Sequence, residues 1–270
     1  MKAPEIPGNE IFRLAALHAL PLLDTAPEAD FDAVVRIGQA LFNLPTCTVT
    51  LVDKHRQWFK ARVGLDAPET HRDVSFCGHA ILQDDVFVVA DASQDERFHD
   101  NPLVTGAPFI RFYAGAPIRL PNGYSIGTVC VFGPEPRTGM APAERKLLQD
   151  LAALALAAIG MRALRDNLDQ AQAEADRLRL VAMALPQPVA LADPAGRLIL
   201  ANEAFAQFCS RPAEEGEDVA ALLDVDAAIW SPAVMLAAGN YEATIPMAGT
   251  RPALSVWRDA QGFVLVQAGR

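Results

Sequence analysis

The sequence predicts an α+β protein in which two domains built on antiparallel sheets are joined by one long helix. The chain has 270 residues, a length that suggests two domains. Strand-like runs separated by turn residues lie on both sides of a stretch from Ala141 to about Leu185, which has no proline after Pro142 and contains a single glycine, Gly160. We therefore expect a first domain at 1–160, a helical linker at 161–184 and a second domain at 185–270.

The central helix is the element that the rest of the chain is organised around. Its length would be roughly 65 Å at the usual rise per residue, more than one domain of this size needs. Up to Gly160 it carries many apolar residues, which is typical of a helix packed on its own domain. From Met161 to Arg179 the apolar stripe narrows to heptad positions flanked by charges, which predicts a coiled coil and a parallel homodimer. The predicted dimer interface is Met161, Leu164, Leu168, Ala171, Ala175 and Leu178.

Composition excludes several classes of function. With 51% hydrophobic and 21% charged residues the chain is globular, and a net charge of −10 argues against binding to nucleic acid. The four cysteines show no CxxC pairing, which predicts a reducing, cytoplasmic compartment. No uninterrupted apolar run reaches the ~18 residues of a membrane span, so we expect none.

The first domain is expected to begin with a frayed arm, Met1–Gly8, followed by two helices. The first helix spans Glu10–Leu20, and the second buries a face that runs from Phe31 to Leu41. The predicted strands are Thr46–Asp53, Arg56–Val63, Val86–Ala90, Phe112–Leu120 and Ile126–Phe132. Thr46–Asp53 alternates apolar residues with threonines, which indicates a half-buried strand. The long connections 64–85 and 91–111 are expected to be functional covers over the sheet.

This region carries the motifs of a known family. They are Asn9-Glu10, Leu23-Asp24-Thr25-Ala26-Pro27-Glu28, Leu51-Val52-Asp53, Arg56-Gln57-Trp58-Phe59-Lys60-Ala61, Glu69-Thr70-His71-Arg72, Ser75-Phe76-Cys77-Gly78-His79-Ala80-Ile81, Asp95-Glu96-Arg97-Phe98, Ile110-Arg111-Phe112-Tyr113-Ala114-Gly115 and Ile126-Gly127-Thr128-Val129-Cys130-Val131. Over about Asn9 to Met161 the chain resembles one subfamily of GAF domains. The resemblance implies a place at the N-terminus of bacterial sensor kinases, diguanylate cyclases and related signalling proteins, many of which have no known ligand.

The short helix that follows Ser75 is the centre of the candidate ligand site. Its free backbone N–H groups could face a small anionic or carbonyl-bearing ligand in the cup of the domain. The alternative is that Ser75 caps the helix while Cys77 and His79 pack locally. The candidate ligand-binding residues are Trp58, Ser75, Phe76, Cys77, His79, Arg111, Tyr113 and Cys130. Strand alternation places Trp58 and Gln57 on opposite faces, so only one of them can see the cup.

Metal and cofactor sites are not indicated. His71, Cys77, His79 and His99 lack the spacing of common zinc sites, and no motif selects a haem ligand. We expect no metal, leave a bilin thioether at a cysteine open, and leave any cofactor unknown.

A thiol enzyme is the alternative from a different class of function. Some proteins that resemble this fold reduce free methionine sulfoxide with pocket cysteines, and Cys77 and Cys130 could face one cavity. The competing interpretation is that Cys47 and Cys130 are small apolar fillers of their strands.

The second domain resembles the start of a PAS domain. Two strands, Val189–Asp193 and Arg197–Ala201, surround an Asp-x-x-Gly turn and lead to an Asn-x-Ala-Phe helix at Asn202–Cys209. Short helices are expected at Pro212–Gly239, followed by strands at Tyr241–Pro246, Leu254–Arg258 and Phe263–Gln267. The resemblance covers about Ala184–Ala268 and implies a role in dimerisation or relay.

The sequence shows no kinase histidine box, cyclase signature, helix-turn-helix or phosphate loop, so we expect no catalytic residue and no enzyme. The predicted function is that of an intracellular sensor. The first domain would detect a small molecule or a redox change, and the helix and second domain would relay it to an effector domain or partner protein. The alternative is a ligand-free dimerisation scaffold.

Overall fold

In the computed structural model the chain divides into two compact units, Met1–Asn167 and Leu168–Arg270. The structure describes residues 1–224, 241–245, 254–258 and 264–268. Each unit holds an antiparallel sheet, so the predicted α+β class with two antiparallel sheets is confirmed. The predicted long helix is also confirmed, as α5, Pro142–Ala184, which has 43 residues.

Unit 1 is a six-stranded sheet in the order β3-β2-β1-β6-β5-β4. Its strands are β1 Thr46–Val52, β2 Arg56–Val63, β3 Glu69–His71, β4 Phe87–Val89, β5 Phe112–Arg119 and β6 Ser125–Gly133. Its helices are α1 Glu10–His18, α2 Ala29–Phe42, η1 Arg72–Val74, α3 Phe76–Ala80, α4 Pro102–Thr105 and the first part of α5. β5 and β6 form the hairpin that Asn122-Gly123 predicts, and Gly123 takes the positive φ of 89° that such a turn requires.

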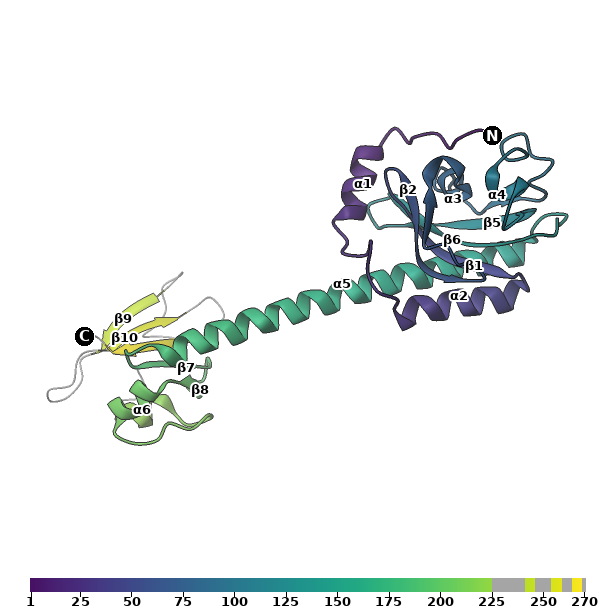
Figure 1. Cartoon of the computed structure of the whole chain (residues 1–270). Helices are drawn as coiled ribbons and strands as arrows, with labels where there is room; N and C mark the ends of the chain where they lie inside the picture. The colour runs from purple at the N-terminus through teal and green to yellow at the C-terminus, as the bar shows by residue number, and fades with distance from the viewer. Residues whose placement is uncertain (225–240, 246–253, 259–263, 269–270) are drawn as a thin grey trace. The chain divides into compact units, whose positions relative to one another are not determined.

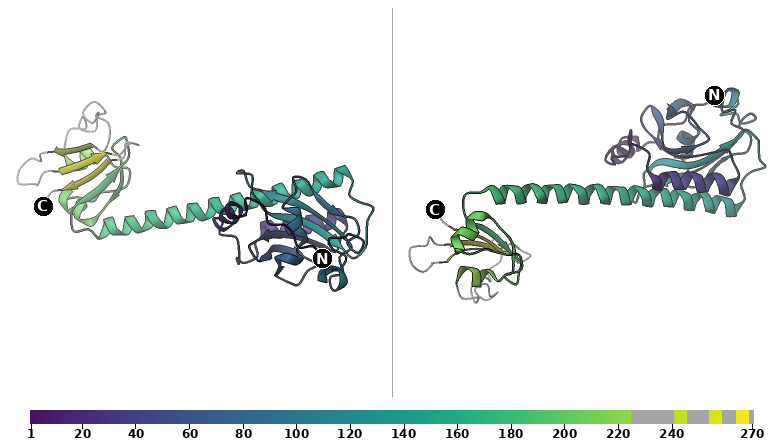
Figure 2. Two further views of the ribbon diagram at one scale, coloured as in Figure 1. Left: turned by 90° about the horizontal axis from the view of Figure 1, so that it is seen from above. Right: turned by 60° about the horizontal axis from the view of Figure 1, so that its bottom comes forward.

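Helices cover both faces of this sheet. α2 and α5 lie side by side on one face, and α3 and α4 lie over the other (Figures 1 and 2). Every residue of β1 and of β6 is consequently buried. The prediction of a half-buried strand at 46–53 is therefore wrong, because the threonines that alternate with apolar residues also face a covered side of the sheet.

The core splits into two clusters, one on each face. The helix-side core includes Leu17, Phe31, Val49, Trp58 and Leu151. The second cluster lies under α3 and α4 and is called here the cup. Its buried members are Val52, Phe76, Cys77, Ala80, Ile81, Phe87, Val89, Ala92, Phe98, Val104, Ile110, Tyr113, Cys130 and Phe132.

The first part of α5 belongs to the helix-side core. Its buried residues are Leu148, Leu151, Ala152, Ala155 and Ile159. Ion pairs then fasten it to the start of α2, from Arg162 to Glu28 and from Arg165 to Asp30. Two residues of α2 that were expected to be buried, Ile37 and Leu41, are instead 46% and 52% exposed.

Helix α5 is long and apolar enough to cross a membrane when only length and composition are considered. This differs from our expectation that the sequence contains no such stretch. Only 28% of the apolar window is buried; Leu148, Leu151 and Ile159 pack into the helix-side core, whereas Leu147 and Leu154 are exposed.

Unit 2 is a five-stranded antiparallel sheet in the order β8-β7-β11-β10-β9. Its elements are β7 Val189–Ala192, β8 Leu198–Ala201, α6 Glu203–Cys209, α7 Val219–Leu223, β9 Tyr241–Ile245, β10 Leu254–Arg258 and β11 Val264–Ala268. Most of the helical segment predicted at Pro212–Gly239 lies outside the described residues; its described part contains α7.

Asn202 joins the end of α5 to this sheet. The side chain is 2% exposed. Its Nδ2 donates to the carbonyl oxygens of Ala182, Leu185 and Gln187, and its Oδ1 accepts from the backbone N–H groups of Val189 and Phe205. One buried amide thus fixes the helix end, β7 and α6 to one another.

A buried ion network closes the edge of unit 1. Arg13 is 1% exposed, and it donates to Val52 O at 2.7 Å and to both carboxylate oxygens of Glu10 at 2.7 and 2.8 Å. Arg72 donates to the same carboxylate. Burial raises the pKa of Glu10, but the hydrogen bonds from Arg13 and Arg72 outweigh it and hold that pKa below its usual value.

Replacing Arg13 with alanine is therefore expected to destabilise the protein by about 3–5 kcal/mol, because it leaves a buried carboxylate and a carbonyl oxygen short of donors. Urea unfolding followed by circular dichroism measures the change. The control is Arg36→Ala on the exposed side of α2, which should stay within about 0.5 kcal/mol of the parent protein. Equal stabilities for the two variants would contradict the structural role of the network.

Candidate functional site

Ser75 starts the short helix that covers the cup. Its Oγ accepts a hydrogen bond from the backbone N–H of Gly78 at 2.8 Å, as the capping alternative predicts, and donates to Gln57 Oε1 at 2.6 Å. Gln57 in turn donates to Thr70 Oγ1 at 2.6 Å. The Ser75 hydroxyl and the Gly78 N–H are thus used within the protein, and Cys77 faces Cys130 on the sheet.

Aromatic side chains fill the cup. The rings of Phe76 and Phe98 stack with centroids 4.0 Å apart, and Tyr113 lies 5.1 Å from Phe76. His79 meets Phe98 edge-on at 4.9 Å, and Phe87 lies 6.1 Å from Tyr113. These contacts bury the ring faces against one another. A ligand in this position would have to displace some of these side chains.

Beneath the rings lies a polar cluster that contains two thiols. Cys77 Sγ and Cys130 Sγ are 3.8 Å apart, and Tyr113 donates its hydroxyl to Cys77 Sγ at 3.3 Å. Thr48 Oγ1 lies 3.1 Å from Cys130 Sγ and 2.7 Å from Thr50 Oγ1. We call Cys77, Cys130, Tyr113, Thr48, Thr50 and Thr128 the thiol cluster.

The register of the central strands assembles this cluster. β1 and β6 pair Thr48 with Cys130 and Thr50 with Thr128. Gly115 on β5 makes room for Tyr113, because a Cβ at that position would lie 2.4 Å from the tyrosine oxygen. The hydroxyl of Tyr113 can therefore lie along its strand and reach Cys77.

The two thiols differ in their ease of ionisation. Burial raises the pKa of Cys77, but the polar side chains around its sulfur, Cys130, Thr128, Tyr113 and Thr50 in that order, outweigh burial and lower its pKa. Burial, followed by the neighbouring Cys77, raises the pKa of Cys130 well above its usual value, and burial also raises the pKa of Tyr113. Negative charge in the cluster is thus favoured on Cys77.

His79 is bound by the N-terminal arm. Its Nε2 lies 3.0 Å from Lys2 O, while the backbone N–H of Lys2 donates to Arg97 O at 2.9 Å. Pro4 is buried against Gly78, where an added Cβ would come within 2.7 Å of the proline ring. The prediction of a frayed arm at Met1–Gly8 is therefore wrong: residues 2–4 lie across α3.

Burial lowers the pKa of His79, and the hydrogen bond to Lys2 O opposes this shift only in part. The ring is consequently neutral over a wider pH range than a free histidine. Neutral Nε2–H can donate to the Lys2 carbonyl, so the imidazole helps to hold the N-terminal arm.

Part of unit 1 matches a known protein family. The family model described as "GAF domain" matches residues 26–159. These residues form a GAF domain. The resemblance read from the sequence motifs is thereby confirmed for this region.

A curated relative extends the comparison. A cyclic di-GMP phosphodiesterase from Pseudomonas aeruginosa is 39% identical over 180 residues, which are 67% of this chain and 31% of the relative. The chain thus spans about a third of the length of that protein. Our expectation that the chain is not an enzyme is contradicted, because this relative bears the name of an enzyme.

Solved structures with a similar chain trace include other GAF domains. The GAF domain of an Acinetobacter phosphoenolpyruvate-protein phosphotransferase is 17% identical, with a TM-score of 0.42, and covers 58% of this chain and 98% of its own. A free methionine-R-sulfoxide reductase from Thermoplasma acidophilum is 15% identical, with a TM-score of 0.40, and covers 48% and 92%.

Two predicted ligand-binding residues of the GAF domain lie away from the cup. Trp58 is buried in the helix-side core because strand alternation turns Gln57, not Trp58, toward α3. Arg111 donates to the carbonyl oxygens of Val104 and Ile110, so it closes its own loop. Ser75, Phe76, Cys77, His79, Tyr113 and Cys130 lie together at α3 and the cup, and their role in ligand binding stays a prediction.

The threonines of the thiol cluster and Gln57 are part of the site but were not predicted from the sequence. The signal was present, because Thr48 and Thr50 occupy one face of an alternating strand. We had assigned that face to solvent, and so gave it no role.

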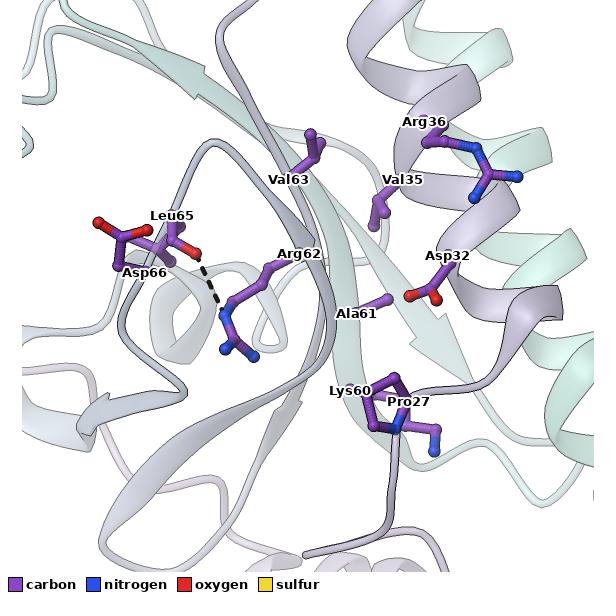
Figure 3. A pocket seen from close by; sticks show the side chains of 10 residues that line it. All are labelled: Pro27, Asp32, Val35, Arg36, Lys60, Ala61, Arg62, Val63, Leu65 and Asp66. Carbon is purple, nitrogen blue, oxygen red and sulfur yellow. Dashed lines mark hydrogen bonds between the residues drawn. The ribbon is translucent and has the colours of Figure 1, made fainter.

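A separate pocket lies between α2 and β2, with a volume of 520 Å³. Figure 3 shows Arg62 turned toward the carbonyl oxygen of Leu65, to which it donates at 3.1 Å, whereas Asp32 and Arg36 extend from α2. The charged groups come from different sides and include both signs, so they do not converge on one ligand atom. Within the described residues no group of three His, Cys, Asp or Glu side chains is placed to hold a metal.

The thiol cluster gives a matched pair of variants. Thr128 Oγ1 is buried and, among the described residues, has no hydrogen-bond partner of ordinary geometry. Thr128→Val should therefore leave the free energy of unfolding unchanged or raise it by about 1 kcal/mol. Thr48→Val removes a hydroxyl that contacts Thr50 and Cys130, and should lower it by about 1–3 kcal/mol.

Thermal and urea unfolding of the two variants tests this difference. Both threonines are fully buried on adjacent strands, so β propensity and volume change equally in the two cases. A larger loss for Thr128→Val than for Thr48→Val would show that the hydrogen bonding of the cluster has been assigned incorrectly.

Proposed function

We propose that the chain is a sensory module that controls cyclic di-GMP turnover in a bacterial signalling protein. The observation that carries this proposal is the 39% identity to a cyclic di-GMP phosphodiesterase over 180 residues. That alignment is longer than the matched GAF segment, residues 26–159, so the likeness extends beyond a widely shared domain. Hydrolysis of cyclic di-GMP is the activity that the module would regulate.

In this proposal unit 2 is a PAS-like domain that receives the signal from α5. Its sheet order, β8-β7-β11-β10-β9, supports this assignment, as does the hairpin that leads to a helix capped by Asn202. Asn202 bonds the last carbonyl groups of α5, so a shift of the helix end would act directly on β7 and α6. At its other end α5 is packed into the helix-side core of the GAF domain.

The proposal also includes a homodimer formed through the middle of α5. Its predicted interface residues Met161, Leu164, Leu168 and Leu178 are 50%, 52%, 61% and 61% exposed, and Ala171 and Ala175 are exposed as well. Pairing two copies along this stripe would cover apolar surface that is otherwise in water. A monomer in sedimentation equilibrium at micromolar concentration would contradict the pairing.

A chimeric enzyme tests the proposed function. The matching segment of the Pseudomonas aeruginosa phosphodiesterase is replaced with this chain, and either four or seven residues are inserted into α5 after Gln170. Seven residues preserve a heptad stripe, whereas four rotate it relative to the following unit. We expect the four-residue insertion to change the rate of cyclic di-GMP hydrolysis by about fivefold or more, and the seven-residue insertion to leave it nearly unchanged.

The control is the phosphodiesterase from which the segment has been deleted. If the chimera and both insertion variants hydrolyse cyclic di-GMP at the rate of this deletion protein, the chain does not regulate the activity and the proposal fails.

A further inference from the structure

The thiol cluster is not explained by packing alone. It places six polar side chains in a cup otherwise filled by aromatic and aliphatic groups. A pair of apolar residues would fill the same space without burying hydroxyl and thiol groups. The cluster therefore suggests a chemical role for its two sulfurs.

The sulfurs of Cys77 and Cys130 are close enough for a small movement to join them in a disulfide bond. Cys77 Sγ and Cys130 Sγ are 3.8 Å apart, and a disulfide requires about 2.05 Å. Cys77 lies on a helix of five residues, α3, while Cys130 lies on a central strand of the sheet. The approach can therefore come from a small shift of α3, with the strand held in place.

The neighbouring side chains give the two sulfurs different roles in disulfide formation. Tyr113 donates a hydrogen bond to Cys77 Sγ, which favours the thiolate and hence nucleophilic attack. Thr48 contacts Cys130 Sγ and holds it beside Cys77, where it can act as the resolving thiol. The hydroxyl of Thr128 is buried, has no hydrogen-bond partner of ordinary geometry in the described part of the chain, and is among the groups that lower the pKa of Cys77, so it can serve as a donor when charge develops on that sulfur.

A route to the cluster begins beside α3. A cavity of 330 Å³ is lined by Lys2, Glu5, His79, Leu82, Gln83, Phe87 and Arg97. It lies between the N-terminal arm and α3, and His79 and Phe87, which line it, are members of the aromatic layer above the thiols. A small neutral oxidant that enters here meets Phe87, whose ring lies 6.1 Å from that of Tyr113, the donor to Cys77.

We propose that Cys77 and Cys130 form a peroxide-reactive dithiol that closes to a disulfide within the GAF domain. The Cys77 thiolate attacks one oxygen of hydrogen peroxide and breaks the O–O bond, which gives a sulfenic acid and a hydroxide that takes up the thiol proton as water. Cys130 sulfur then attacks the Cys77 sulfur, and the sulfenic hydroxyl leaves with the Cys130 proton as a second water. Two electrons pass from the two sulfurs to the peroxide.

Closure of this bond would reach the surface through α3. The helix carries Cys77 together with Gly78 and His79, which hold residues 2–4 of the N-terminal arm. Drawing α3 toward β6 changes those contacts. That this change alters cyclic di-GMP turnover rests on the proposed function, whereas formation of the disulfide does not.

Peroxide treatment of the reduced full chain tests the proposal. Samples are denatured in an alkylating reagent after increasing times, and the mass of each cysteine peptide is measured. We expect Cys77 and Cys130 to become resistant to alkylation together, joined as one peptide pair that has lost two hydrogen atoms. Cys47, a buried thiol in the helix-side core, is the internal control and should remain alkylated.

Two variants separate the steps. Cys130→Ser should stop at the Cys77 sulfenic acid, which dimedone traps, and Cys77→Ser should leave Cys130 reduced. The wild-type measurement stands even if a variant does not fold. Cys77 and Cys130 that remain alkylated after Cys47 has oxidised, or a disulfide that joins Cys77 to another cysteine, would overturn the proposal.

The chimeric phosphodiesterase tests the dithiol separately from the proposed control of cyclic di-GMP turnover. A peroxide-dependent change in hydrolysis rate that is lost in Cys130→Ser would support both. A disulfide that forms without any change in rate would support the dithiol and count against its link to cyclic di-GMP.

Discussion

Burial of both faces of β1 and β6 is the constraint on which the GAF domain depends. These strands lie at the centre of the sheet, and all of their residues are buried because α2 and α5 cover one face while α3 and α4 cover the other. A polar side chain on either face therefore has no access to water, and any hydrogen bond it makes is made inside the protein. The position of α3 is what turns the second face into a closed cup.

This constraint explains the arrangement of the cup. Thr48 and Thr50 bond to each other, Thr48 also reaches Cys130, and Tyr113 reaches Cys77 over the space that Gly115 leaves. The result is a closed set of hydroxyl and thiol groups whose arrangement favours negative charge on Cys77 rather than on Cys130. The aromatic layer occupies the space above this cluster, so a bulky ligand would have to displace its rings.

Much of the fold followed from local sequence. The long helix, the strands of unit 1 and the Asn122-Gly123 turn are close to their predicted positions because periodicity and turn residues act over short distances. The role of Thr48 could not be predicted in this way. Whether an alternating strand faces water or a second layer depends on where α3 and α4 pack, and that is determined by residues far along the chain.

The candidate site, too, was predictable from the sequence only in part. The motif from Ser75 to His79 and the residues Tyr113 and Cys130 identified the cup, because their order resembles a known family. The 3.8 Å approach of Cys77 to Cys130 depends on strand register and on the docking of a short helix, neither of which the motif specifies. The contact of Pro4 with Gly78 could likewise not be predicted, since an arm rich in proline gives no periodic pattern.

Carbon-13 chemical shifts of the cysteine β-carbons, followed against pH in the reduced full chain, measure the ionisation of each thiol directly. We predict that Cys77 titrates below ~8.5, the ordinary thiol value, while Cys47 and Cys130 remain protonated through that range. The reason is that the polar neighbours of Cys77 outweigh the effect of its burial, whereas burial dominates at Cys47 and Cys130 and raises their pKa values. A Cys77 signal that stays that of a thiol up to the pH at which the protein unfolds would show that the cup does not hold an activated sulfur.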